Sequence, residues 1–268
     1  MAKLDSVDGV GVFVRDQKRA RDFYVKKLGL KVRDWEPKWK YLELGTTKTG
    51  RDASISLWQP SKEWGSESYE AGTKAIGEVT GISFATGNLD ATISKLAKKG
   101  IKVGETESDE SGRLVEFQDV DGNTYFVYEE RAKVRRAGLT RLDSITIASR
   151  AAKMTGEFFR RALGMRSSKI PGTSFKVYRL HPGGTGLLPF TPTREMYPNP
   201  SDYESDLTHI GERTSIGFMT RDLMALQEKL MAHGVRFRQK AKREEWGGIQ
   251  ARFLDPDDNE YSIIQYRA

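Results

Sequence analysis

The strongest constraint on the fold is a hairpin sequence that occurs twice in the chain. VEFQDVDGNTYFVYE spans Val115–Glu129, and ARFLDPDDNEYSIIQ spans Ala251–Gln265, starting 136 positions later. In each copy an acidic run separates two apolar runs. Asp, Gly, Asn and Pro favour turns because they tolerate unusual backbone angles or bond their own main chain. The flanking runs are typical of strands. The spacing, in a chain of 268 residues, predicts a duplicated protein.

The segments before each hairpin also repeat. Val10–Val14 alternates as a strand does, Asp16 is a typical N-cap, and the helix predicted over Gln17–Lys27 ends at Gly29. Three strands are predicted to follow, near Lys31–Trp35, Trp39–Leu44 and Ala53–Gln59. The same strand, helix and three-strand order returns three more times, so the chain is predicted to hold four βαβββ modules.

This order predicts an α+β fold of two paired-module domains, each a curved mixed sheet forming a cup with helices on its convex side. The first domain is predicted over 1–130, with modules at about 5–60 and 80–130. A basic linker over 131–138 precedes the second domain, 139–268, with modules at about 140–192 and 213–268. The concave side of such a cup is where a small molecule would bind.

Composition excludes several classes of protein. The chain has no cysteine, which excludes disulfides and thiolate metal ligands. The net charge is +7, and the basic residues are interspersed with acidic ones. No basic stripe is combined with stacking aromatic residues, so no nucleic-acid partner is predicted. No run approaches the roughly 18 apolar residues that cross a bilayer. A cytoplasmic monomer or homodimer is expected, with a small-molecule ligand and no membrane contact.

The module pattern resembles a known superfamily. Asp16, Phe23-Tyr24 and Leu28-Gly29-Leu30 after the first strand, and an acidic turn before the last one, are similar to motifs of the vicinal-oxygen-chelate superfamily. That superfamily includes glyoxalase I, extradiol ring-cleaving dioxygenases, and bleomycin- and fosfomycin-resistance proteins. The resemblance covers nearly the whole chain. It implies the cup fold and, in the metal enzymes, a divalent ion held by His, Gln or Glu on cup-facing strand positions.

Eight positions of this chain correspond to those metal-ligand positions by their offset from the turns. They are Gly9, Ser56, Gly81 and Phe126 in the first pair of modules, and Ser144, Leu188, Ser215 and Ser262 in the second. None is His, Glu, Asp or Gln, and neutral serine is a poor ligand for a divalent ion. No metal or other cofactor is therefore predicted. The alternative is a divalent metal at an unusual site that uses Asp8, Glu129 or Glu260.

Strand alternation predicts that the cups are lined by aromatic and apolar side chains. Phe13, Trp58, Phe126 and Tyr128 face the first cup, and Phe190, Met219 and Ile264 face the second, with Ser144, Thr146 and Ser262 as small polar groups. The predicted ligand-binding set is Phe13, Ser56, Trp58, Phe126, Tyr128, Phe190, Met219, Ser262 and, at the rim, Trp246. Such residues suit a small aromatic or apolar ligand. They are equally compatible with a filled core.

An enzyme is the competing hypothesis. It would be a lyase, isomerase or extradiol ring-cleaving dioxygenase with an atypical or absent metal site, and His209, Glu212 or Tyr128 would donate or accept protons. His209 lies in the connector Thr191–Thr214, where a lid over the second cup is expected. His233 in a last helical turn has the character of a surface residue, and His181 precedes a turn.

Overall fold

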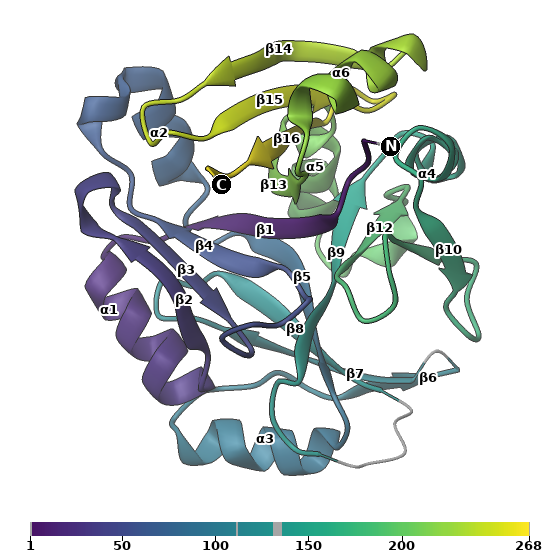
Figure 1. The fold of residues 1–268 in the computed structure, drawn as a ribbon. Helices are drawn as coiled ribbons and strands as arrows, with labels where there is room; N and C mark the ends of the chain where they lie inside the picture. The colour runs from purple at the N-terminus through teal and green to yellow at the C-terminus, as the bar shows by residue number, and fades with distance from the viewer. Residues whose placement is uncertain (1, 111, 131–135, 268) are drawn as a thin grey trace. The chain divides into compact units, whose positions relative to one another are not determined.

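The computed structural model describes residues 2–110, 112–130 and 136–267 (Figure 1). Within these ranges the chain forms the four predicted βαβββ modules, in the predicted order. Of the predicted basic linker, 131–138, residues 131–135 lie outside the described part of the chain. No helix of the described residues is both long enough and apolar enough to span a membrane.

The first two modules contain the following elements. The first comprises β1 (Ser6–Phe13), α1 (Gln17–Asp22) continued by the π-helical η1 (Phe23–Leu28), β2 (Lys31–Glu36), the short η2 (Pro37–Trp39), β3 (Tyr41–Gly45) and β4 (Ser54–Trp58). The connector holds η3 (Lys62–Trp64) and α2 (Ser66–Lys74). The second comprises β5 (Val79–Thr86), α3 (Leu89–Lys98), β6 (Glu107–Asp109), β7 (Gly112–Gln118) and β8 (Thr124–Glu129).

The other two modules repeat this order. The third comprises β9 (Arg141–Ala148), α4 (Ala152–Arg161), β10 (Arg166–Lys169), β11 (Lys176–Arg179) and β12 (Gly186–Phe190). Its connector holds η4 (Arg194–Met196) and α5 (Pro200–His209). The fourth comprises β13 (Arg213–Met219), α6 (Leu223–Ala232), β14 (Arg236–Arg243), β15 (Ile249–Leu254) and β16 (Glu260–Gln265).

Helix boundaries follow the predicted capping chemistry. Asp16 caps α1 by accepting a hydrogen bond from the Arg19 backbone N–H at 2.7 Å, and Asp222 caps α6 by accepting one from Ala225 at 3.1 Å. Gly29 ends the first helix with a φ of 82°, in the left-handed region that glycine adopts without a steric penalty. These contacts confirm the predicted ends.

The chain divides into two compact units. The N-terminal unit comprises Val10–Ile145 with Pro171–Thr173. Its second module pairs β5 with β8 in parallel and β7 with β8 antiparallel, which makes the sheet mixed. Helix α1 packs on β4, and α3 packs on β8. The helix-facing core of this module contains the buried rings of Phe84, Phe117 and Tyr125, the last two stacked with centroids 5.4 Å apart.

The C-terminal unit comprises Met1–Gly9, Thr146–Ile170 and Ser174–Ala268. It repeats the pattern, with β13 and β16 parallel and β15 and β16 antiparallel. Helix α6 packs on β14–β16, and α4 packs on β11 and β12 (Figure 1). Phe218, Phe253 and Tyr261 take the core positions of the three rings in the N-terminal unit, and Phe253 stacks on Tyr261 at 5.2 Å. The duplication therefore extends to the core.

The acidic turn of each hairpin fastens the modules of its unit together. In the N-terminal unit, Asn123 Nδ2 donates to the Phe13 carbonyl at 3.1 Å, and Asp121 Oδ2 accepts from the Arg15 N–H at 3.0 Å. In the C-terminal unit, Asn259 Nδ2 donates to the Ala148 carbonyl at 3.2 Å. These aspartates and asparagines are buried and bonded to main chain, so the interpretation as turn formers is correct.

The strand order corrects one prediction about the cups. One sheet has the order β14-β15-β16-β13-β1-β4-β3-β2, and the other has the order β10-β11-β12-β9-β5-β8-β7-β6. The first and fourth modules thus share a sheet, as do the second and third, whereas consecutive modules were predicted to share one. Phe13 and Trp58 lie in the sheet that contains β1 and β4, and Phe126 lies in the sheet that contains β5 and β8. The physical reason is that strand neighbours are set by long-range pairing, here of β13 with β1 and of β9 with β5. The modules have similar sequences, so the residues near each strand do not specify which strand will pair with it.

Three further segments differ from expectation. The repeated module order places a strand at Ile101–Gly104, but there only Val103 makes an isolated bridge, to Phe117, and the edge strand of the second module is β6. The connectors Pro60–Val79 and Thr191–Thr214 each form a helix, although their sequences lack a strong apolar stripe.

Candidate functional site

The open face of the first module, opposite its helices, presents aromatic rings. Trp58 of β4 is half-buried and pairs across the sheet with Tyr41 of β3, their ring centroids 5.2 Å apart. Trp64 of η3 approaches Trp58 edge-on at 6.1 Å. Leu57, the neighbour of Trp58, is fully buried on the helix side, which confirms the alternation that placed Trp58 on this face.

Polar groups lie beside these rings. Ser56 is half-buried on β4, and its partner in the register is Glu43 of β3. The carboxylate of Glu43 accepts a hydrogen bond from the buried Ser54 hydroxyl. Glu43 was not among the predicted site residues, although the alternation of YLELG contained the signal: Leu42 and Leu44 are both fully buried, so Glu43 must face the other way.

Helix α2 covers Phe13, the remaining predicted aromatic of this face. A Cβ on Gly72 would lie only 2.9 Å from Phe13 Cε1, so the helix backbone rests directly against the ring. The connector between the first two modules therefore forms part of the site.

Tyr128, on β8, belongs to a network of charged side chains. Its hydroxyl accepts from Arg141 Nη2 at 3.3 Å, and Arg141 also donates to Asp143 and to both carboxylate oxygens of Glu130. Burial, and next the Asp143 carboxylate, raise the pKa of the Tyr128 phenol well above its ordinary value. At neutral pH the phenol is therefore a hydrogen-bond donor and a poor base, which weakens its predicted role in proton abstraction.

The open face of the fourth module carries the predicted Met219 and Ser262. Both are half-buried, and Gly217 pairs with Ser262 across β13 and β16. Gln250 donates to the Ser262 hydroxyl at 3.3 Å. A Cβ on Gly217 would meet only Ile264 Cδ1 at 3.7 Å and the Gly9 carbonyl at 3.8 Å, so this part of the face is bare backbone.

Two other predicted ligand-binding residues lie on the second sheet. Phe126 of β8 pairs with Ser83 and Glu116, and it is half-buried. Phe190 of β12 is half-buried as well, and its carbonyl accepts from the Ser149 N–H at 2.9 Å.

Trp246 packs on its own hairpin. It is 42% exposed and lies 6.1 Å from the Tyr266 ring, and a Cβ on Gly248 would overlap its indole. Gly248 thus allows the ring to lie flat on the turn, so Trp246 has a local structural role.

Ser215 has an unusual backbone among the eight ligand-equivalent positions. Its φ is 56°, in the left-handed region of backbone conformation. The register of the pairing between β13 and β16 shifts around this residue, between Arg213 and Gly217. The equivalent Gly81 also has a positive φ, of 67°. Backbone strain of this kind at a non-glycine residue clusters at functional sites.

The carboxylates of the alternative metal site have other partners. Glu129 accepts from the Leu89 N–H at 3.2 Å at the start of α3, and Asp8 accepts from the Tyr266 hydroxyl at 2.6 Å. Glu260 forms ion pairs with Arg238 and Arg252. Within the described ranges, no three His, Asp or Glu side chains are grouped so that they could hold a metal ion.

The histidines do not gather with the predicted aromatic residues. His209 ends α5, and the Glu212 N–H donates to the His209 carbonyl at 3.2 Å. The electrostatic influence of His209 favours the charged form of the Asp206 carboxyl group. Burial raises the pKa of Asp206, whose carboxylate accepts from the Tyr197 hydroxyl. Glu212 is exposed. His181 lies in the turn that follows β11.

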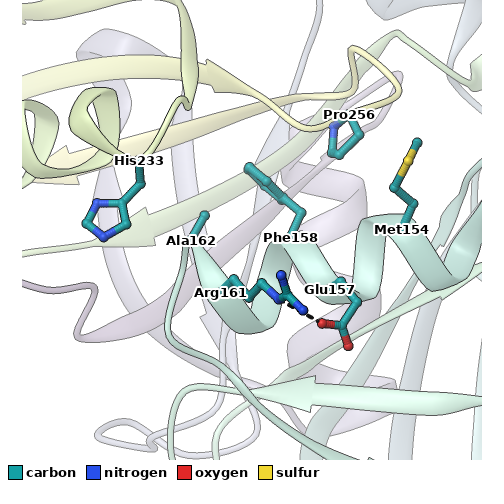
Figure 2. Close-up of a pocket in the computed structure, with 7 residues that line it drawn as sticks. All are labelled: Met154, Glu157, Phe158, Arg161, Ala162, His233 and Pro256. Carbon is teal, nitrogen blue, oxygen red and sulfur yellow. Dashed lines mark hydrogen bonds and ion pairs between the residues drawn. The ribbon is translucent and has the colours of Figure 1, made fainter.

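A shallow groove lies on the helix side of the C-terminal unit, and Figure 2 shows its walls. Its volume is about 280 Å³, and it is lined by Met154, Glu157, Phe158 and Arg161 of α4, with Ala162, His233 and Pro256. Glu157 and Arg161 pair with each other at 3.1 Å. None of the predicted ligand-binding residues lines this groove.

Solved structures with the same fold include two that cover nearly the whole chain. Glyoxalase I from Zea mays is 15% identical, with 99% of this chain and 92% of that chain covered and a TM-score of 0.65. A putative dioxygenase from Bacillus subtilis subsp. subtilis str. 168 is 14% identical, with 99% and 86% covered and a TM-score of 0.65. At these identities the likeness establishes the fold.

Sequence comparison agrees with the duplication. The uncharacterized protein YetH of Bacillus subtilis (strain 168) is 25% identical over 130 residues, which cover 47% of this chain and 99% of YetH. The family model of the Glyoxalase/Bleomycin resistance protein/Dioxygenase superfamily matches twice, over residues 6–125 and 141–263. The chain therefore belongs to the Glyoxalase/Bleomycin resistance protein/Dioxygenase superfamily, as a tandem member.

Proposed function

We propose that the protein binds a small aromatic or apolar molecule on the open face of its first module. The observation that carries this proposal is Trp58, half-buried between the rings of Tyr41 and Trp64. Offset and edge-on ring contacts of this kind also suit a flat ligand, whose burial supplies affinity. Ser56 and Glu43 add hydrogen-bonding groups beside the rings, which would orient a bound molecule.

Binding is proposed to need no metal ion. The support is the chemistry of the residues at the ligand-equivalent strand positions: Gly9 and Gly81 offer only backbone, and Ser56 and Ser262 offer neutral hydroxyls. Elemental analysis of the protein purified without chelator tests this. About one tightly bound Fe, Mn, Ni or Zn per chain would overturn the metal-free proposal.

Trp58→Ala is expected to weaken binding of a neutral aromatic probe, 1-nitronaphthalene, by about tenfold or more, because it removes the largest apolar contact of the face. Quenching of intrinsic tryptophan fluorescence and isothermal titration measure the dissociation constant. Trp35→Ala is the matched control. Trp35 is 48% exposed and is stacked under Arg21 at 4.5 Å, away from the Trp58 cluster.

The two variants separate the outcomes. The control should bind the probe as the unmodified protein does. Unchanged affinity in Trp58→Ala, or an equal loss in both variants, would show that the probe does not use this face and would refute the assignment.

A further inference from the structure

The open face of β14–β16 holds a guanidinium that the fold itself does not require. Arg252 lies between Ala251 and Phe253, both fully buried on the helix side, so its side chain is on the open face. Its Nε and Nη2 donate to Gln239 Oε1 at 3.0 and 2.7 Å, and its Nη1 donates to Glu260 Oε1 at 3.0 Å. The network fixes the guanidinium in place.

The duplicated hairpin provides an internal comparison. Aligning the two acidic turns places Glu116 at the position of Arg252 and Thr124 at the position of Glu260. Both hairpins have the same strands and register: Glu116 pairs with Phe126, as Arg252 pairs with Ser262. The first copy folds with the opposite charge, so Arg252 and Glu260 are not needed to form the hairpin.

The surroundings of Arg252 keep a surplus of positive charge. Glu260, only 7% exposed, is shared by two guanidiniums, Arg252 and Arg238, each at 3.0 Å. Arg213 pairs with Glu260 in the strand register, and Glu244 accepts from Gln239 at 3.3 Å. Two guanidiniums thus share one carboxylate, with Arg213 beside it on the neighbouring strand, and Glu244 reaches the network through Gln239. Within the described residues the hydrogen bonds of Arg252 use three of its five N–H groups, and its side chain is 32% exposed.

Bare backbone lies beside this charge. Across the sheet, Arg252 neighbours Ser262, Ser262 neighbours Gly217, and Gly217 lies near the Gly9 carbonyl. A row that begins with a fixed guanidinium and ends on two glycines can accommodate a flat group whose charged end meets the arginine.

We propose that Arg252 is the anchor of a carboxylate-binding subsite, which takes the carboxylate of a planar organic acid. The free N–H groups of the guanidinium match a carboxylate in geometry and charge, and the Ser262 hydroxyl and the Gln250 amide stand next to them. This subsite differs from the proposed aromatic site, because it selects an anion and uses none of Tyr41, Trp58 and Trp64.

Benzoate is the probe, benzamide is its neutral isostere, and inorganic phosphate is a second anion. Isothermal titration of the intact protein should show benzoate binding, with benzamide and phosphate each at least about tenfold weaker. Arg252→Gln should weaken benzoate by about tenfold or more, and Arg252→Lys by less, because lysine keeps the charge but lacks the fork. Arg236→Gln, on β14 and paired with Asp258, is the matched control and should bind normally.

A second variant keeps the test independent of stability. Arg252→Glu with Glu260→Thr installs the residues of the first hairpin, which folds with them, so this double variant should fold and lose benzoate. Circular dichroism checks the fold. Equal affinity for benzoate and benzamide, preference for phosphate, or unchanged benzoate binding in Arg252→Gln would each overturn the proposal. Trp58→Ala should leave benzoate binding unchanged, so failure here and failure of the proposed aromatic face are distinguishable.

Discussion

Asp119→Ala is expected to lower the free energy of unfolding by about 3–5 kcal/mol, the range for breaking a buried charged network. Oδ1 of this buried carboxylate accepts from the backbone N–H groups of Asp121 and Asn123 at 2.8 and 3.0 Å. Oδ2 accepts from Asn123 Nδ2 at 2.8 Å and from the Tyr24 hydroxyl at 2.6 Å. Alanine would remove the acceptor of these four hydrogen bonds and would release the turn that holds Phe13. Urea unfolding followed by circular dichroism measures the loss.

The second copy supplies the control. Phe159 stands where the first copy has Tyr24, and there the Tyr261 hydroxyl donates to Asp255 at 3.1 Å. Tyr24→Phe imitates this natural arrangement, so it should cost only about 1 kcal/mol, the value of one hydrogen bond. If Asp119→Ala destabilised the protein no more than Tyr24→Phe does, the acidic turn would not be the fastening between the two modules.

Gly156→Ala is expected to destabilise the protein by about 1–3 kcal/mol, although alanine ordinarily favours helices over glycine. Gly156 lies inside α4, and a Cβ there would come within 2.1 Å of the Tyr178 hydroxyl oxygen and 2.5 Å of Cζ. Tyr178 is only 5% exposed and packs edge-on against Phe159, so its ring has little room to move. Thermal unfolding measures the effect.

A double-mutant cycle identifies the cause. Tyr178→Leu removes the ring atoms nearest to Gly156, so Gly156→Ala should cost less in that background and can become stabilising. An equal cost of Gly156→Ala in both backgrounds would show that the ring contact is not responsible.

The fold was largely predictable because its signals are local and repeated. Asp16 and Asp222 as caps, Gly29 as a stop, and the two acidic turns each act within a few residues. Alternation indicated the face of β4 on which Trp58 lies, because its neighbour Leu57 is fully buried on the opposite face.

The partners in each sheet were not predictable from the same signals. All four modules open with similar apolar strands, and nothing in the sequence around β1 or β5 distinguishes one neighbour from another. Helices α2 and α5 were missed because their apolar stripes are weak, and tertiary contacts such as Gly72 against Phe13 hold α2 in place. Arg252 was not predicted as a site residue, because it is neither aromatic nor at a position equivalent to a metal ligand.

The path of β9 has a consequence for any attempt to divide the protein. Its first residues belong by sequence to the second half, yet Ser144 pairs with Ser83 and Ile145 with Ile82 in the N-terminal unit. In the same way, Met1–Gly9 at the start of the chain belongs to the C-terminal unit. A fragment cut in the linker would leave an unpaired edge on β5, and bare strand edges promote association between chains. The two halves of the sequence are therefore not independent units. A soluble fragment that contains β5 has to include the residues of β9 that pair with it.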